Sequence, residues 1–234
     1  MATETALETW LDRAIRTVLF FTPLRHLVLY KYRYAFTPGQ IRCLLNLADE
    51  ALKANGGFVE VGCYRGYTTV FLNKHLDDVA PERAYLAVDT FGGFTADSVA
   101  HEVEHRGKST KDRAFNKFTV NSETMFATTL KVNRISRVRI LRNDICRAEF
   151  QPVEEFCFGL IDVDLYTPTV AALAKIWESL SPGGILVVDD CQKDHVYDGS
   201  RQALEEFCAA RGVAFEILET KLGVIRKPLA HKTR

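Results

Sequence analysis

The sequence has no surplus of charge of either sign, because 30 Lys and Arg residues balance 30 Asp and Glu residues among 234 positions. Proteins that bind nucleic-acid phosphates usually carry a basic surplus, so this balance argues against a nucleic-acid partner. The chain also lacks a long hydrophobic run. Its longest apolar window near the start, residues 14–29, is interrupted by Arg16, Pro23, Arg25 and His26. Such a window is too polar to cross a bilayer, so we expect no stable membrane insertion.

The six cysteines form no C-x-x-C pair and have no zinc-finger spacing. They are Cys43, Cys63, Cys146, Cys157, Cys191 and Cys208. Most lie in apolar stretches, which is typical of reduced, packed thiols in a cytoplasmic protein. Residues 1–9 lack the basic start and apolar core of a signal peptide. We therefore predict a cytoplasmic location.

Intrinsic disorder is excluded by the composition, which is 47% hydrophobic and 26% charged. Residues 5–34 have helical, aromatic and amphipathic character, and a second helix begins at a Thr37 cap followed by Pro38. We predict that residues 1–56 are N-terminal helices packed on the core or on a second subunit, and we favour a homodimer. A flap over the substrate and a helix lying on a membrane surface are the alternatives. Residues 57–234 form the main domain.

Five short apolar runs follow, each ending in a turn or an acid: 58–61, 84–88, 138–141, 157–161 and 185–188. Runs of this length and composition are typical of buried parallel strands. The segments 214–219 and 224–226 flank a polar turn and predict an antiparallel hairpin. The expected fold is therefore α/β, with a doubly wound, mostly parallel, seven-stranded sheet. The long polar interval at about 91–134 predicts a lid insertion.

In such a sheet, ligands bind outside the carboxyl ends of the strands. The first run leads into a loop with glycines at Gly62 and Gly66, which lets the backbone approach a ligand. The dinucleotide-binding pattern would need glycine where Tyr64 stands, so a nicotinamide cofactor is disfavoured. Asp89 ends the second run, where a carboxylate can bind ribose hydroxyls. Asp144 follows the third run, in a position to meet an adenine edge.

The strongest signal is a set of four acids at the ends of the fourth and fifth runs. Asp162 and Asp164 follow one run, and Asp189 and Asp190 follow the next, with a single helix between. Like charges so close are unfavourable without a cation or a shared proton. Oxygen donors without His or Cys suit Mg²⁺ or another hard divalent cation. The alternative is a group of solvated turn acids.

The segments EVGCYRGYTT, VDTFGGF, LIDVDLYTPT and GGILVVDDC together resemble the S-adenosylmethionine-dependent O-methyltransferases of the macrocin (TylF-like) type. The resemblance covers about residues 58–207, and the paired-Asp motifs are its more specific part. It implies a Rossmann-like class I methyltransferase fold in which residues 57–234 bind S-adenosylmethionine. It also implies a small hydroxylated acceptor, commonly a sugar hydroxyl on a natural product.

The resemblance also implies roles for individual residues. By this resemblance Asp162, Asp189 and Asp190 hold Mg²⁺, and Asp164 is the general base. A more distant similarity to catechol O-methyltransferase includes the first loop, although those enzymes place a lysine base where this chain has Leu165. The residues expected to bind the cofactor are Glu60, Gly62, Tyr64, Gly66, Thr68, Asp89 and Asp144.

Three other functions remain open at this stage. The first is a metal-independent methyltransferase of the same fold, and the second is a non-catalytic S-adenosylmethionine-binding scaffold. The third is a zinc hydrolase, since residues 101–105 spell H-E-x-x-H. We interpret that motif as part of a solvated lid, because its surroundings read as a hydrophilic insertion and not as a buried helix. His195 is expected in a loop, and Arg201 is expected to pair with the acids or to touch substrate.

Overall fold

The computed structural model describes residues 6–29, 32, 34–109, 115, 118–150, 154–193 and 195–229. The chain divides into two compact units between residues 35 and 36. The first unit contains helix α1 (Ala6–Phe20) and a 3₁₀ helix, η1 (Pro23–Leu27). Thr22 caps η1 by accepting a hydrogen bond from the backbone N–H of Leu24. Within the described residues, the structure has no helix with the length and apolar character needed to span a bilayer.

The second unit begins with helix α2 (Pro38–Ala51), which starts where the sequence predicts. Thr37 and Gln40 form a reciprocal capping box, because each side chain accepts a hydrogen bond from the backbone N–H of the other. Leu44 and Ala48 are buried together with residues of the sheet. The apolar stripe of α2 thus belongs to the core of the second unit, so the division into compact units lies before α2. The predicted domain boundary after residue 56 stays a prediction.

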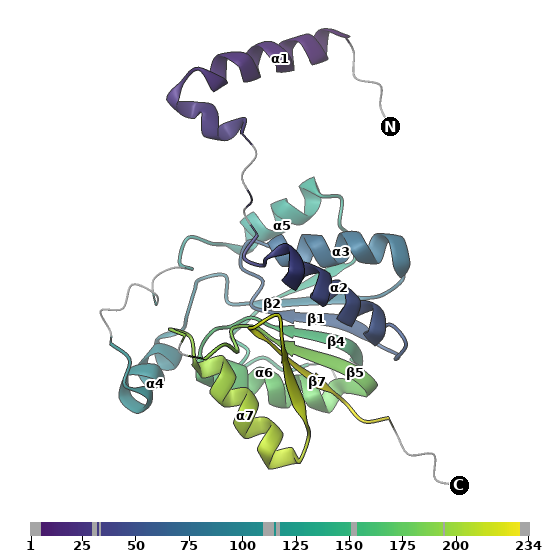
Figure 1. Ribbon diagram of the computed structural model, residues 1–234, viewed down its shortest axis with the longest axis vertical. Coiled ribbons are helices and arrows are strands. Elements are labelled where there is room, and N and C mark those ends of the chain that lie inside the picture. Colours follow the sequence, from purple (N-terminus) through teal and green to yellow (C-terminus); the bar gives the residue numbers. More distant parts are fainter. Residues whose placement is uncertain are drawn as a thin grey trace. The chain divides into compact units, whose positions relative to one another are not determined.

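The sheet has the seven predicted strands, in the order β3-β2-β1-β4-β5-β7-β6. Strands β1 to β5 pair in parallel, and β7 pairs antiparallel with both β5 and β6. This order confirms the doubly wound α/β fold (Figure 1). The strands are β1 (Gly57–Val61), β2 (Tyr85–Asp89), β3 (Val138–Arg142), β4 (Phe156–Ile161), β5 (Leu180–Val188), β6 (Phe215–Leu218) and β7 (Leu222–Arg226).

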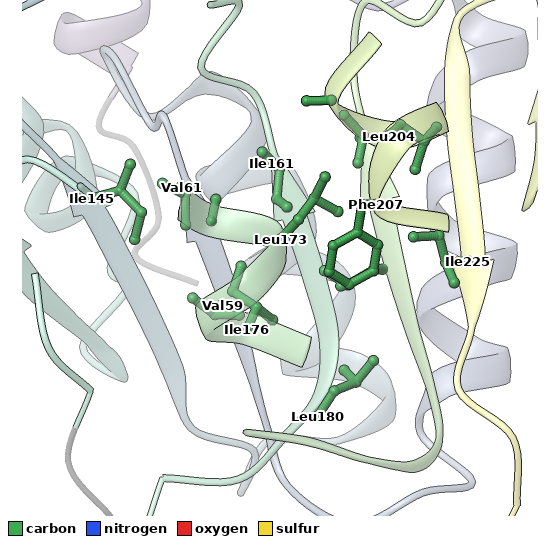
Figure 2. Close-up of a cluster of buried hydrophobic side chains, with 14 of the residues drawn as sticks. Val59, Val61, Ile145, Ile161, Leu173, Ile176, Leu180, Leu204, Phe207 and Ile225 are labelled. Atoms are coloured by element: carbon green, nitrogen blue, oxygen red, sulfur yellow. The ribbon is translucent and has the colours of Figure 1, made fainter. Parts of the chain in front are cut away.

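Helices cover both faces of the sheet. Helix α3 (Tyr67–Val79) lies with α2 on one face, and α6 (Tyr166–Ser179) and α7 (Gly199–Arg211) lie on the other (Figure 1). On the α6 and α7 face, Leu173 and Phe207 belong to one apolar cluster with Val59 and Val61 of β1 and with Ile161 of β4 (Figure 2). Burial on both faces explains why the strands read as nearly continuous apolar runs.

The interval predicted as one lid contains two helices, α4 (Ala96–Arg106) and α5 (Glu123–Val132). Helix α5 buries Phe126 and Leu130 in a cluster with Ala87 of β2. It is therefore the ordinary crossover between β2 and β3, and only the part of the interval before α5 stands outside the βαβ pattern. Residues 110–114, 116 and 117 of the interval lie outside the described residues.

Candidate active site

The carboxyl ends of β1, β4 and β5 lie side by side, because Val61 pairs with Ile161 and Ile161 pairs with Val188. The ladder continues one residue further, since the N–H of Asp162 donates to Val61 (2.8 Å) and that of Asp189 donates to Ile161 (2.9 Å). The loops that follow these strands are therefore neighbours at one edge of the sheet. The structure thus brings the acids predicted at the ends of β4 and β5 together.

The four acids share one electrostatic environment. Burial, and then the charges of Asp189 and Asp164, raise the pKa of Asp162 well above its usual range. Burial and a hydrogen bond with Asp190 do the same to the pKa of Asp164. Asp164 is 8% exposed and Asp189 is 4% exposed, so the interpretation of these two as solvated turn acids is wrong. Asp164 and Asp190 also have positive φ angles, of 63° and 56°. Backbone strain of this kind clusters at active sites.

A lysine that sequence analysis missed lies among the acids. The ammonium nitrogen of Lys221 is 2.6 Å from Oδ2 of Asp189 and 3.5 Å from Oδ1 of Asp190. Burial lowers the pKa of Lys221, but the two carboxylates outweigh burial and raise it overall. Val188 pairs with Gly223 in the antiparallel ladder, so continuing that register beyond Val188 brings Lys221 beside Asp190. The sequence alone does not indicate this contact, because the contact depends on the register in which the last hairpin pairs with β5.

The donor chemistry of the cluster fits a hard divalent cation. Carboxylate oxygens are the preferred ligands of Mg²⁺, and Oδ1 of Asp189 is buried without a hydrogen-bond partner. Burial also raises the pKa of Asp189 to about 6, although Lys221 acts against this shift. Nevertheless, in the part of the chain that the structure describes, no three His, Cys, Asp or Glu side chains converge closely enough to hold an ion. The roles of Asp162, Asp189 and Asp190 as metal ligands thus stay a prediction.

The loop between β1 and α3 packs against the first acidic loop. Gly62 has a φ of +92°, and a Cβ atom there would lie 1.8 Å from the carbonyl oxygen of Asp162. Gly66 has a φ of +81° and precedes the first residue of α3. Tyr64, also with positive φ, donates its N–H to Oδ2 of Asp89 (2.7 Å). The predicted glycine loop and the predicted ribose acid are therefore in direct contact.

Asp89 joins two loops and keeps capacity for a ligand. Its other oxygen, Oδ1, accepts a hydrogen bond from the N–H of Phe91 (2.6 Å). The backbone N–H of Cys63 also acts on this carboxylate. A carboxylate has about four acceptor positions, so three backbone donors still leave one position for a ribose hydroxyl. Burial raises the pKa of Asp89, and the backbone N–H groups that it binds oppose that shift. Asp144 is half-buried and accepts from the N–H of Cys146 (2.9 Å) at the end of β3.

Glu60 lies inside the protein, 1% exposed, and Thr68 is half-buried near the start of α3. Oε2 of Glu60 accepts hydrogen bonds from Thr69 (2.6 Å) and from Tyr85 (2.7 Å). Burial raises the pKa of Glu60 to about 7 despite these bonds. Glu60 therefore connects β1, α3 and β2, and its contact with a cofactor stays a prediction.

The elevated pKa of Glu60 predicts a pH-dependent stability. The folded protein binds a proton at Glu60 up to about pH 7, whereas the unfolded chain releases it near 4.5. Stability should therefore fall as pH rises through this window, by up to about 3 kcal/mol from this group. The free energy of unfolding, measured with urea at pH 5 and at pH 8, should differ less between the two pH values for Glu60→Gln than for the original protein. Equal differences in the two proteins would contradict the assignment.

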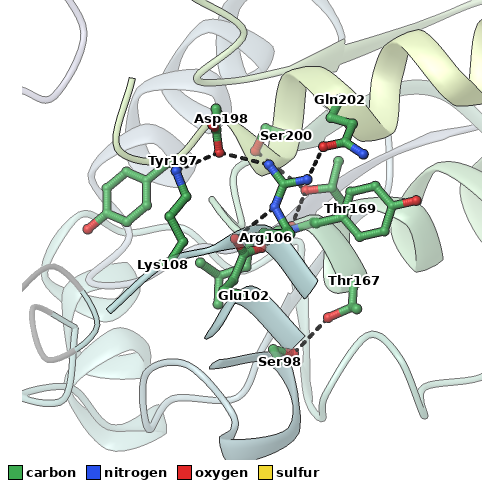
Figure 3. A network of polar contacts seen from close by, with 12 residues as sticks. Ser98, Glu102, Arg106, Lys108, Thr167, Thr169, Tyr197, Asp198, Ser200 and Gln202 are labelled. Atoms are coloured by element: carbon green, nitrogen blue, oxygen red, sulfur yellow. Dashed lines mark hydrogen bonds and ion pairs between the residues drawn. The ribbon is translucent and has the colours of Figure 1, made fainter. Parts of the chain in front are cut away.

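A polar network anchors α4 to the first residues of α6 and α7 (Figure 3). Glu102 is 2% exposed; its Oε1 accepts the N–H of Tyr166 (2.8 Å), and its Oε2 accepts Nε of Arg106 (2.9 Å). Arg106 also donates to Asp198 (2.8 Å), the residue before α7. The H-E-x-x-H segment is thus helical, and Glu102 is the one buried residue among its five. Its glutamate holds Arg106 and the start of α6.

The two remaining candidates lie beside the acids with different partners. Nδ1 of His195 is 3.9 Å from Oδ2 of Asp190 and accepts the N–H of Tyr197 (3.3 Å). Arg201 donates to Glu205 (2.8 Å) and to the carbonyl of Cys191 (2.9 Å). Neither partner belongs to the four acids, and the alternative that Arg201 touches substrate stays a prediction.

An aromatic cluster that sequence analysis also missed runs from the glycine loop toward the second acidic loop. The rings of Tyr64 and Phe118 lie 5.3 Å apart between centroids, as do those of Phe118 and Phe94. Phe94 in turn lies 6.1 Å from Tyr197. These residues come from separate loops, so only the fold brings them together. We call Tyr64, Phe94, Phe118 and Tyr197 the aromatic wall.

Comparison with known proteins gives a family match and several structural likenesses. The sequence model of the macrocin O-methyltransferase (TylF) family matches residues 41–222. The structure of the O-methyltransferase NovP is similar, with a TM-score of 0.67 and 18% identity over 81% of this chain and 80% of that one. CalS11, a calicheamicin methyltransferase, has a TM-score of 0.68 and 17% identity over 96% and 94%. No curated protein sequence matched the chain. At these identities the likeness shows the fold alone, that of class I methyltransferases.

Proposed function

The chain belongs to the macrocin O-methyltransferase (TylF) family, and on that premise we propose that it methylates a hydroxyl of a small natural product with S-adenosylmethionine as the donor. The observation that carries the proposal is the collection of buried acids at the ends of β4 and β5, next to the Gly62 loop. The structural neighbour TomG from Streptomyces achromogenes is described in complex with S-adenosylmethionine. CalS11 is described as a TDP-rhamnose 3′-O-methyltransferase, which supports a glycosylated acceptor.

We propose that the donor binds at the ends of β1 and β2. S-Adenosylmethionine supplies an activated methyl group, and the chain supplies its alignment. Asp89 offers its free acceptor position to the ribose, and the backbone at Gly62 allows close approach of the methionine end. The transfer is an in-line displacement, so much of the rate enhancement comes from holding oxygen, methyl carbon and sulfur in line. We assign that alignment to this loop and to the aromatic wall.

Asp164 is the group that we assign as general base. It is buried among carboxylates that raise its pKa, so it binds a proton more readily than an ordinary aspartate does. As the acceptor oxygen bonds to the methyl carbon, the carbon–sulfur bond breaks and S-adenosylhomocysteine leaves. The hydroxyl proton passes to Asp164. The reaction therefore needs no other reactant.

We further propose that Asp162, Asp189 and Asp190 hold Mg²⁺. A bound divalent cation would supply positive charge that makes the acceptor hydroxyl more acidic. A metal-independent reaction is the second candidate, and one observation favours it. The ammonium of Lys221 already neutralises Asp189 and lies near Asp190, so part of the required positive charge is present in the chain.

Metal removal distinguishes the two candidates. We expect a methylation assay with labelled S-adenosylmethionine, against glycosylated and phenolic acceptors, to lose activity at least about 100-fold with EDTA and to recover it with Mg²⁺. Full activity after chelation would favour the metal-independent reaction. Cofactor binding without turnover on any acceptor would favour a non-catalytic scaffold.

The first unit supports a proposal about assembly. Trp10 and Val18 on α1 are 63% and 65% exposed, although both are large apolar side chains. We propose that this helix face pairs with a second copy of the chain in the cytoplasm. Light scattering should therefore report a dimer, and Trp10→Glu combined with Val18→Glu should shift it toward a monomer. A monomer before substitution would contradict the proposal.

A further inference from the structure

Lys221 is held in the acid cluster by its backbone as well as by its side chain. It is the residue immediately before β7, and its N–H donates to the carbonyl of Leu218 (3.2 Å). Its own carbonyl accepts the N–H of Cys191 (2.8 Å), the residue directly after Asp190. The turn between β6 and β7 is thus bonded to the second acidic loop, and the start of the Lys221 side chain has a fixed position next to that loop.

The side chain of Lys221 is enclosed over most of its surface. It is only 14% exposed, and its ammonium nitrogen lies 4.4 Å from the centroid of the Phe36 ring. An aromatic face is a favourable neighbour for a cation. The ammonium therefore has three stabilising partners: the two carboxylates of the β5 loop and this ring. This arrangement differs from that of a surface lysine that reaches an acid by chance.

Two of the three predicted metal ligands are the ones that Lys221 contacts. A divalent cation at Asp189 and Asp190 would compete with the ammonium for the same carboxylates, and the two positive charges would repel each other. With Asp189 bound to Lys221, no three ligating side chains in the described residues are close enough to hold an ion.

We propose that Lys221 is an internal cation that holds the β5 acids in the metal-free protein and that a divalent cation must displace. The inference rests on the metal site given under the proposed function. It adds that the metal affinity of this chain is set by Lys221 as well as by the ligands. A lysine that merely anchored the hairpin would affect stability and leave metal affinity unchanged.

The test is direct measurement of metal affinity on the full chain, by calorimetric titration with Mn²⁺. Lys221→Met removes the charge and keeps most of the volume, and should tighten Mn²⁺ binding at least tenfold. Lys221→Arg keeps the charge and should bind within about threefold of the original protein. Lys227→Met is the matched control, because Lys227 lies just after the same strand and donates to the carbonyls of Trp177 and Leu180. It should leave Mn²⁺ affinity unchanged.

A second measurement uses the original protein and does not depend on the folding of a variant. The rate of Lys221 acetylation by a soluble acetylating reagent, followed by mass spectrometry, should rise at least threefold when Mg²⁺ is added. Unchanged or weaker Mn²⁺ binding by Lys221→Met would overturn the inference and leave the metal site standing. Absence of Mn²⁺ binding by both proteins would overturn the metal site and the inference together. An acetylation rate of Lys221 that does not change when Mg²⁺ is added would also overturn the inference.

Discussion

Replacing Asp164 with asparagine is expected to lower the turnover number at least about 100-fold while leaving the affinity for S-adenosylmethionine unchanged. Asparagine has nearly the same shape, and it tolerates the positive φ of 63° that residue 164 adopts. What it loses is the capacity to accept the hydroxyl proton. Burial and the neighbouring carboxylates already disfavour a charge at Asp164, so a neutral amide suits the same environment and thermal stability should stay equal or rise.

The measurement is a steady-state methylation assay together with calorimetric titration of the cofactor. Asp97→Asn provides the control, because Asp97 is exposed and pairs with the exposed Arg147 (3.0 Å). The raised pKa of Asp164 adds a pH signature, since the base acts only when deprotonated. The acidic limb of the turnover profile should therefore lie above the range of an ordinary aspartate. If the Asp164→Asn protein turned over nearly as fast as the Asp97→Asn protein, Asp164 would be removed from the mechanism.

The strands and the acids could be predicted because their signals are local. Each buried strand is a short apolar run, and Asp162 and Asp189 directly follow two of them. A parallel sheet then brings strand ends to one edge without further information. This is why four acids from two distant segments could be predicted from the sequence alone to lie at one edge of the sheet.

Features that depend on pairing between distant segments were not predictable. Lys221 meets Asp189 only because the last hairpin pairs with β5 in one register. Glu102 lies in a stretch that reads as polar, yet the fold inserts it against the start of α6, where a backbone N–H and Arg106 satisfy its charge. Composition cannot distinguish a charged residue in solvent from one buried with a partner.

The N-terminal helices show a further limit of prediction from sequence patterns. The Thr37 cap and the apolar stripe of α2 predicted a helix correctly. An amphipathic stripe does not, however, indicate which surface the helix packs against. The structure assigns Leu44 to the core that also buries Phe158 and Val187 of the sheet.

Gly62→Ala is the substitution for which we expect the largest loss of structure and of cofactor binding together. The new methyl carbon would lie 1.8 Å from the carbonyl oxygen of Asp162, and that oxygen belongs to the backbone and cannot rotate away. The φ of +92° adds strain for any residue with a side chain. We expect the free energy of unfolding to fall by about 3 kcal/mol or more, since overpacking and backbone strain act together.

The substitution should also weaken cofactor binding, because the clash can be relieved only by moving the Gly62 loop away from the first acidic loop. Tyr64 would move with it and weaken its bond to Asp89, so the affinity for S-adenosylmethionine should fall at least tenfold. Gly212→Ala is the matched control, because Gly212 also has positive φ (+63°) but nothing lies within 4 Å of an added Cβ. The free energy of unfolding of Gly212→Ala should fall by only about 1 kcal/mol, which is the contribution of the positive φ angle without a steric clash. Urea unfolding and calorimetric titration of both variants distinguish the effect of backbone strain from that of the steric clash. Equal losses of unfolding free energy and of cofactor affinity in the two variants would show that the close approach of the two loops has no energetic consequence.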